Sequence, residues 1–247
     1  VVSKPTRFAV PPMQVKTALD EALLAAKVDF LYGCYVTDLL RDRGGKLAGI
    51  VMANRSGRQA VRAKVIIDAT DRAIAARLAG AEFSPYPAGK QKFSRMVVGG
   101  TAREGARETG HRVVVRESGR KQKDQTYQTY EYRLKLPMKD GSWTSFARAD
   151  QQARNMTWQE GQVGAAEMLF QVPPDPLRSR GQQAGPWPGA AGIDLDAMRP
   201  AGVDGIYVLG GCADISREAA GQLLRPLNGI ALGARVGTEA AKAASTR

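Results

Sequence analysis

The sequence predicts an α/β fold, in which buried strands run directly into helices, joined to a separate and mostly antiparallel β-rich layer. The apolar stretch AKVIIDAT at residues 63–70 leads straight into an Ala-rich helical stretch at residues 71–81. The apolar stretch GIYVLGG at residues 205–211 also precedes helical sequence. Between them, from about residue 93 to residue 170, the pattern changes to strands rich in Arg, Val, Tyr and Thr. Strand-to-helix alternation of this kind is typical of a sheet covered by helices.

The first third of the chain predicts one helix followed by a β-meander. Pro11 and Pro12 suit the first turn of a helix, and apolar residues follow at helical spacing until about Lys27. The next segments, residues 28–42, LAGIVMAN and QAVRAKVIIDAT, read as extended strands. The turns between them contain glycine, which readily adopts the positive φ that tight turns need. We therefore expect a meander that returns to the main sheet.

The middle of the chain predicts a β-rich region. The stretches FSRMVVGGTA, HRVVVRES, QTYQTYEYRLKLPM and SWTSFARA read as strands. Residues 154–172 fit a helix or a loop. Residues 173–192 are rich in Pro, Gly and Gln and read as a long surface connection.

The C-terminal segment predicts a buried strand, the irregular stretch CADISREAAGQLLRPLN and a final helix, GIALGARVGTEAAKAAS. In that helix Gly229, Gly233 and Gly237 lie four residues apart, so one helix face carries no side chains. Such a face admits another backbone or a flat ligand at close range. Both close helix packing and ligand contact remain open.

Composition argues against several kinds of site. With 43% hydrophobic and 24% charged residues, the composition is ordinary for a globular protein. The two cysteines, Cys34 and Cys212, match no metal-binding spacing, and His111 is the one histidine, so we expect no metal site. The sequence has no apolar run of about 18 residues and no secretory signal, which predicts a cytoplasmic location. It does not begin with Met, which favours a processed, truncated or mid-gene start.

The net charge of +12 favours an anionic partner. Proteins that follow phosphate backbones usually concentrate basic residues on one face. Here Lys and Arg alternate with acidic and apolar residues along the chain. A small anionic substrate or an acidic partner chain therefore fits this pattern better than nucleic acid does.

Polar residues mark the carboxyl end of the predicted strand at residues 63–70. Asp68 and Thr70 lie where the strand ends and a helix begins. In doubly wound folds this edge, together with the helix N-terminus, is where nucleotides bind. We therefore expect a nucleotide at this edge of the sheet.

Three blocks of the sequence together resemble FAD-dependent oxidoreductases with a glutathione-reductase-type Rossmann domain. They are VDFLYGCYVTDLLRDRGGKLAGIVM, GRQAVRAKVIIDATDRAIAARLAGAEF and DGIYVLGGCADISREAAGQLLRPLNGIALGARVGTEAA. The resemblance implies FAD as the cofactor and a partial FAD-binding Rossmann-type fold of three layers. Residues 1–92 would form a partial FAD-binding domain with the meander, residues 93–192 a β-rich substrate or cap region, and residues 193–247 the strand and helix that complete the FAD-binding domain.

The resemblance also implies which residues meet FAD. Val36 corresponds to a valine whose backbone contacts the adenine ring, and Ala69 and Thr70 pass the adenosine and pyrophosphate. Asp68 instead anchors the turn from strand to helix. Asp214 stands in for an acid that binds the ribityl chain.

Two further sets of residues lie around the last strand. The first set lines the ribityl chain and pyrophosphate, and the second begins a helix whose N-terminus faces the N1/O2 edge of the flavin. A helix N-terminus stabilises the negative charge of a reduced flavin there. The first set is Gly210, Gly211 and Cys212, and the second is Leu227, Asn228 and Gly229.

The sequence departs from the family in two places. The initial strand, Gly-x-Gly-x-x-Gly turn and helix are absent. The usual Thr-Gly-Asp is altered, because Thr70 is followed by Asp71 and Arg72. The missing unit therefore lies on another chain, is truncated from this sequence, or has been lost together with the cofactor.

The resemblance implies hydride transfer from an unknown small organic substrate to flavin N5, a reaction that needs orientation and charge stabilisation more than a dedicated catalytic group. Arg225, just before the final helix, and His111 are the catalytic candidates, and Cys212 has no neighbouring cysteine in sequence for redox chemistry. Two alternatives remain open: a non-catalytic binding or structural module derived from a flavoprotein, and a basic protein that binds polyanions.

Overall fold

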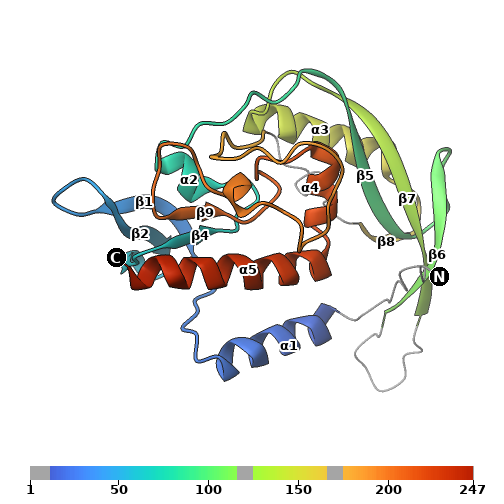
Figure 1. Cartoon of the computed structure of the whole chain (residues 1–247). Helices are drawn as coiled ribbons and strands as arrows, with labels where there is room; N and C mark the ends of the chain where they lie inside the picture. Colours follow the sequence, from blue (N-terminus) through green and yellow to red (C-terminus); the bar gives the residue numbers. More distant parts are fainter. Residues whose placement is uncertain (1–11, 116–124, 166–174, 247) are drawn as a thin grey trace. The chain divides into compact units, whose positions relative to one another are not determined.

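A computed structural model describes residues 12–115, 125–165 and 175–246 (Figure 1). The chain divides into two compact units, Val1–Tyr35 and Val36–Arg247. In the first unit, α1 (Pro12–Ala25) precedes an irregular segment. Tyr32 from this segment hydrogen bonds to Asp20 and meets Phe30 edge to face, with 5.4 Å between ring centroids. The predicted first helix is confirmed.

The second unit begins with the predicted meander of β1 (Tyr35–Arg41), β2 (Leu47–Asn54) and β3 (Gly57–Arg62), in that order across the sheet. β2 and β3 are antiparallel. The third predicted strand is corrected, because the chain leaves this sheet after Arg62 and begins a new strand at Ile66. QAVRAKVIIDAT therefore belongs to two sheets.

A parallel pair forms the centre of the helix-covered region. β4 (Ile66–Asp68) pairs with β9 (Ile206–Val208). Ile206 and Val208 pack in one core cluster with α2 (Ile74–Leu78), whereas Tyr207 packs in another with α5 (Pro226–Ser245). Because alternate residues of a strand point to opposite faces, α2 and α5 cover opposite faces of the pair. This is the three-layer arrangement that the sequence predicts.

The direction of α5 decides where its N-terminus lies. A Cβ atom on Gly233 would lie 3.7 Å from the Leu209 side chain, just after β9. Near the other end of the helix, Lys64 Nζ, just before β4, donates to the carbonyl of Ala244 at 3.0 Å. The helix therefore runs antiparallel to both strands, along them in Figure 1. The helix begins at Pro226, and Gly233 lies beside Leu209, just after the end of β9. Because each helical residue rises about 1.5 Å, the first turn extends about 10 Å beyond the carboxyl edge of the pair.

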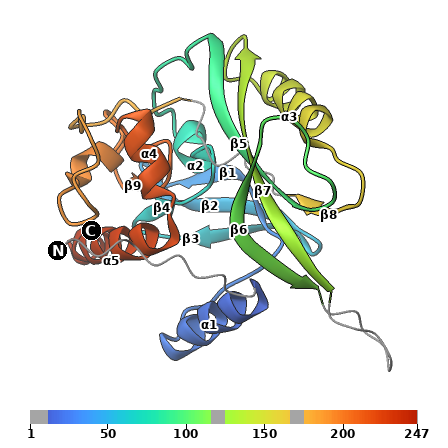
Figure 2. The same cartoon turned by 90° about the vertical axis from the view of Figure 1, so that its right-hand side faces the viewer.

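The predicted β-rich layer is an antiparallel four-stranded sheet with the order β6-β7-β5-β8. Its strands are β5 (Gly89–Gly99), β6 (Ala106–Val115), β7 (Gln125–Met138) and β8 (Gln162–Ala165). α3 (Trp143–Thr157) packs against β5 and β7, with Phe146, Ala149 and Ala153 buried in the shared core (Figure 2). The division into parts at residues 92 and 192 stays a prediction.

The strand predicted from SWTSFARA is wrong, because these residues begin α3. The Ser142 hydroxyl accepts a hydrogen bond from Ser145 N at the helix N-cap, at 3.2 Å. The hydroxyls of both serines donate to Asp140, and these bonds lower the pKa of the Asp140 carboxyl to about 2. This capping network outweighs the alternation of the side chains, which suits either structure.

The stretch predicted to be irregular between β9 and α5 also contains a helix, α4 (Arg217–Leu223), capped by the Ser216 hydroxyl. A short 3₁₀ helix, η2 (Leu195–Met198), precedes β9. In the described part of the chain, no helix is long and apolar enough to cross a membrane.

The glycine face of α5 does not hold a closely packed helix in the described structure. A Cβ on Gly229 or Gly233 would make only ordinary contacts, at 3.9 and 3.7 Å, and one on Gly237 would meet nothing within 4 Å. Among the described residues no helix packs closely on this face, so the structure does not support the helix-packing interpretation there.

We expect Gly237→Ala to raise the free energy of unfolding by about 0.5–1 kcal/mol, because alanine loses less backbone entropy in a helix interior. Gly49→Ala serves as the opposite case, since its Cβ would lie 2.0 Å from Val61 O at a φ of 152°. We expect that change to cost more than about 2 kcal/mol. Urea denaturation measures both, and destabilisation by Gly237→Ala would show that something occupies this face.

Candidate functional site

The candidate site lies at the carboxyl edge of β4 and β9. Because the strands are parallel, the segments that follow them meet there. A Cβ on Gly210 would lie 3.5 Å from the carbonyl of Thr70. The Cys212 thiol donates to the carbonyl of Asp71 at 3.6 Å. The structure therefore brings together two of the predicted segments, 69–70 and 210–212.

Asp68 holds the turn between β4 and α2, as predicted. One oxygen of its buried carboxylate accepts hydrogen bonds from the backbone N–H of Thr70 at 3.0 Å and from the Thr70 hydroxyl at 2.6 Å. The other accepts from the N–H of Ala76 at 3.0 Å. The Thr70 hydroxyl in turn accepts from the N–H of Ile74 at 2.9 Å. Within this turn the buried Ala73 has a left-handed backbone with a φ of 49°, which costs energy in any residue but glycine.

The N-terminus of α5 is open at the same edge. Arg225 occupies the N-cap position with no hydrogen bond from its side chain to the helix, and Pro226 follows at the first position. The next residue, Leu227, is 81% exposed. Asn228 Nδ2 donates to the carbonyl of Gln222 at 2.8 Å, which ties this turn to α4. The segment 227–229 therefore presents a helix N-terminus with partly exposed side chains, a favourable place for negative charge.

The other predicted site residues have different surroundings. Val36 packs against the core cluster that contains Ile66 and Cys212, below the candidate site. Asp214 accepts hydrogen bonds from the backbone and hydroxyl of Ser179, at 3.1 and 2.9 Å, so it holds the neighbouring loop. The backbone of His111 lies in β6, on the edge of the four-stranded sheet, and its side chain lies outside the described structure. The roles of these residues toward FAD stay predictions.

Cys212 is fully buried, and burial raises the pKa of its thiol to about 12. The thiol therefore stays protonated at neutral pH, and a protonated thiol is a poor nucleophile. Redox chemistry at this residue is disfavoured. Because its side chain points inward, only its backbone can line a ligand.

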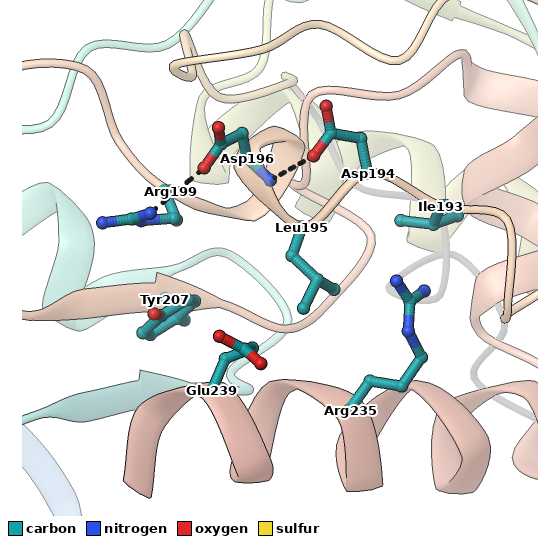
Figure 3. A pocket seen from close by; sticks show the side chains of 8 residues that line it. All are labelled: Ile193, Asp194, Leu195, Asp196, Arg199, Tyr207, Arg235 and Glu239. Atoms are coloured by element: carbon teal, nitrogen blue, oxygen red, sulfur yellow. Dashed lines mark hydrogen bonds and ion pairs between the residues drawn. The ribbon is translucent and has the colours of Figure 1, made fainter. Parts of the chain in front are cut away.

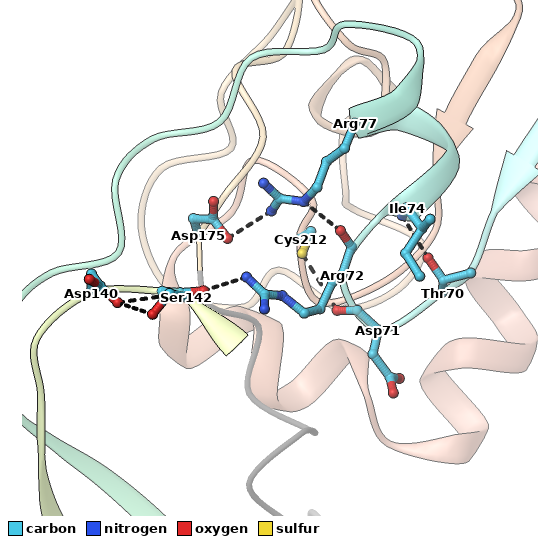
Figure 4. A network of polar contacts seen from close by, with 10 residues as sticks. Thr70, Asp71, Arg72, Ile74, Arg77, Asp140, Ser142, Asp175 and Cys212 are labelled. Atoms are coloured by element: carbon cyan, nitrogen blue, oxygen red, sulfur yellow. Dashed lines mark hydrogen bonds and ion pairs between the residues drawn. The ribbon is translucent and has the colours of Figure 1, made fainter. Parts of the chain in front are cut away.

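Sequence analysis did not identify Arg72 as a site residue. Its guanidinium lies over the ring of Trp143, with 4.2 Å from Cζ to the ring centroid. Arg72 Nη2 also donates to the carbonyl of Gly141 at 2.5 Å, next to the labelled Ser142 in Figure 4. It connects the turn after β4 with the start of α3. The sequence signal was an arginine just after the strand-end Thr70, where the family has a different pattern.

Two surface hollows lie elsewhere. One, of about 320 Å³, lies between η2, β9 and α5, where Arg199 pairs with Asp196 at 3.2 Å (Figure 3). The other, of about 870 Å³, is lined by Lys64 and residues 202–204, which precede β4 and β9. It therefore lies at the amino edge of the pair, opposite the candidate site. Within the described residues, no cluster of His, Cys, Asp or Glu could hold a metal ion.

The family model described as FAD dependent oxidoreductase matches residues 2–177 of the sequence. This match spans most of the chain. The chain belongs to the FAD-dependent oxidoreductase family. FAD is therefore its assigned cofactor, and the family predicted from the sequence is confirmed.

Three solved structures are similar to this family member. A triple mutant of the flavin-dependent brominase Bmp2 is 11% identical with a TM-score of 0.50, and the alignment covers 98% of this chain and 58% of the brominase. The anhydrotetracycline hydroxylase OxyS from Streptomyces rimosus is 12% identical with a TM-score of 0.41, covering 96% and 46%. Glycine oxidase from Geobacillus kaustophilus is 17% identical with a TM-score of 0.34, covering 90% and 53%.

Only the brominase has a TM-score that reaches 0.5, so only this likeness is informative. At 11% identity it concerns the fold alone. The chain spans 58% or less of the length of each of these structures. Among curated proteins, no match to the chain is found.

The described residues of this family member fit one end of FAD. The uncapped N-terminus of α5 suits the electron-rich edge of a flavin ring. No glycine-rich turn for the pyrophosphate precedes β1 in the sequence.

We expect Asp68→Asn to lower the free energy of unfolding by about 2–3 kcal/mol, because the amide nitrogen cannot accept the hydrogen bonds that the carboxylate accepts. Asp71→Asn is the matched control on an exposed side chain of the same turn, with an expected change below about 0.5 kcal/mol. Urea denaturation gives both values. Equal effects of the two substitutions would contradict the anchoring role of Asp68.

We expect iodoacetamide at pH 8 to leave Cys212 unmodified in the folded protein, since a pKa of about 12 leaves about one thiolate per ten thousand thiols. Cys34 is partly exposed and serves as the internal control. Peptide mass spectrometry follows both cysteines, before and after unfolding in urea. Modification of Cys212 in the folded protein as fast as Cys34 would contradict its burial.

Proposed function

We propose that the chain is a subunit or fragment of an FAD-dependent oxidoreductase in which a small organic substrate transfers a hydride to flavin N5. The observation that carries the proposal is the meeting of three features at one sheet edge. The Thr70 turn and the Gly210 segment adjoin there, and the open N-terminus of α5 projects from the same edge. Family membership supports the general activity.

The described residues would hold the two ends of the cofactor differently. Backbone groups of Gly210 and Gly211 would follow the ribityl chain, and Ala69 and Thr70 would contact the adenosine side. FAD supplies the hydride acceptor when bound. The N–H groups of Leu227 and Asn228 would stabilise the negative charge that develops at the N1/O2 edge. Arg225, at the N-cap, would add a positive charge at the same place.

The open edge of β4 supports a further part of the proposal, a glycine-rich unit from a missing segment or a second chain. In the described structure β4 pairs with β9 and with no other strand. Ile66 and Asp68 make the ladder bonds to β9, so the backbone groups of Ile67 point to the other edge. Ile67 is also 39% exposed. A parallel strand there would complete both the sheet and the pyrophosphate site.

The reading frame upstream of Val1 tests this part. A strand followed by three spaced glycines and a helix, upstream or in a neighbouring gene, would support it. Their absence from both places would contradict it and would favour the non-catalytic module. That second candidate rests on the same open edge, which leaves the cofactor site incomplete within the described residues.

Flavin binding tests the main proposal. We expect the purified chain to bind FAD, with an absorbance band at ~450 nm that shifts on binding. Leu227→Asp should weaken binding at least about tenfold, because it places a negative charge at the helix N-terminus where flavin charge would lie. That exposed position needs no repacking, and a carboxylate there suits the helix itself. Thr238→Asp is the matched control on the same helix, with an expected change below about twofold.

Saturable FAD binding that is unaffected by Leu227→Asp would contradict the placement of the flavin. No FAD binding by the chain, either alone or together with the glycine-rich unit, would contradict the proposal for this chain. Salt-dependent retention on an anionic column without any flavin would instead favour the polyanion-binding alternative.

A further inference from the structure

We propose that Arg72 anchors an anionic group of the substrate, a carboxylate or a phosphate on a small organic molecule. The inference rests on the proposed function for the meaning of "substrate", but not for the binding itself.

The Arg72 guanidinium carries five N–H groups. One nitrogen, Nη2, donates to the carbonyl of Gly141. The other two, Nε and Nη1, are buried and have no hydrogen-bond partner. Leaving such donors buried and unpaired is unfavourable, because their hydrogen bonds to water are lost without replacement. An oxyanion is the ligand that would satisfy them best, since it accepts several hydrogen bonds and compensates the charge.

The charges around Arg72 leave a positive excess. Its neighbours are Arg77 and Asp175, together with the neutral thiol of Cys212. Asp175 pairs with Arg77 at 2.7 Å, and no carboxylate among the described residues forms an ion pair with Arg72. Burial lowers the pKa of Arg72, and repulsion from Arg77 lowers it further. Two guanidinium groups therefore share one carboxylate, so an anion is attracted to this place.

The walls of the site are aromatic. The Arg72 Cζ atom lies 4.2 Å from the centroid of the Trp143 ring and 5.3 Å from the centroid of the Phe146 ring. The Trp143 side chain is 62% exposed, whereas Phe146 is buried. An anion would therefore reach Nε and Nη1 by displacing one exposed ring and not by opening the core.

The position of Arg72 suits a substrate more than a cofactor. Its backbone belongs to the turn after β4, beside Asp71 and Cys212, but its guanidinium reaches Gly141 at the start of α3 (Figure 4). The side chain therefore points from the carboxyl edge toward the β-rich region. Arg77 Nε donates to the carbonyl of Arg72 at 2.7 Å, which fixes the turn. An anion held there would lie between the two regions.

Calorimetric titration of the FAD-free chain with benzoate and, separately, with inorganic phosphate tests the proposal. We expect saturable binding of at least one probe, and the two arms distinguish a carboxylate from a phosphate. Arg72→Gln should weaken that binding at least about tenfold, since it removes a charge-assisted hydrogen-bond donor. Arg148→Gln is the matched control, an exposed arginine on α3 without the stacked geometry, and should change affinity less than about twofold.

A measurement on the unsubstituted chain covers the case in which Arg72→Gln does not fold. We expect the bound probe to shift the Nε–H resonance of Arg72 and the emission of Trp143, whereas chloride at equal ionic strength does neither. No saturable binding of either probe, or equal affinity in Arg72→Gln, would overturn the proposal. Leu227→Asp should keep anion binding. Saturable anion binding by an unsubstituted chain that binds no FAD, alone or together with the glycine-rich unit, would reject the proposed function but not this site.

Discussion

The buried carboxylate of Asp68 is the contact on which the candidate site depends. Its three hydrogen bonds hold Thr70 and the first turn of α2 against the end of β4. They also hold Ala73 in a left-handed conformation that alanine disfavours by itself. Without this anchor, the turn that carries Thr70 and Arg72 would lose its contact with the end of β4 through the Asp68 side chain. A polar residue in a buried strand is costly, and here its hydrogen bonds compensate that cost.

The direction of the two strands and the direction of α5 together determine which segments meet around that anchor. The parallel pairing of β4 and β9 brings the segments after each strand to one edge. The antiparallel course of α5 brings its N-terminus to the same edge and its C-terminus to the other. Positive helix-end potential therefore gathers on the side where the strand-end turns lie. The hollow of about 870 Å³ lies at the opposite, amino edge of the pair, and it has no part in the proposed chemistry.

Much of the fold was readable from local pattern, and two of the errors have the same origin. The strand before Asp68, the meander and the final helix have strong periodicity and clear turn residues. SWTSFARA failed because its alternation suits a strand as well as a helix, and the decision came from Asp140 and the serine cap. The stretch before α5 was predicted to be irregular for the same reason, because the hydrogen bond of the Ser216 cap starts α4 there. Capping bonds depend on side-chain placement, which periodicity does not report.

The sequence by itself determined the strand-to-helix units, the family and the anchoring role of Asp68, because each depends on residues that are neighbours along the chain. Only the tertiary structure decided that Thr70 adjoins Gly210, that Cys212 is too buried to react, and that Arg72 keeps unpaired donors. Burial and missing hydrogen bonds depend on segments more than a hundred residues apart, such as Asp71 and Cys212. Such properties arise only when distant parts of the chain pack together.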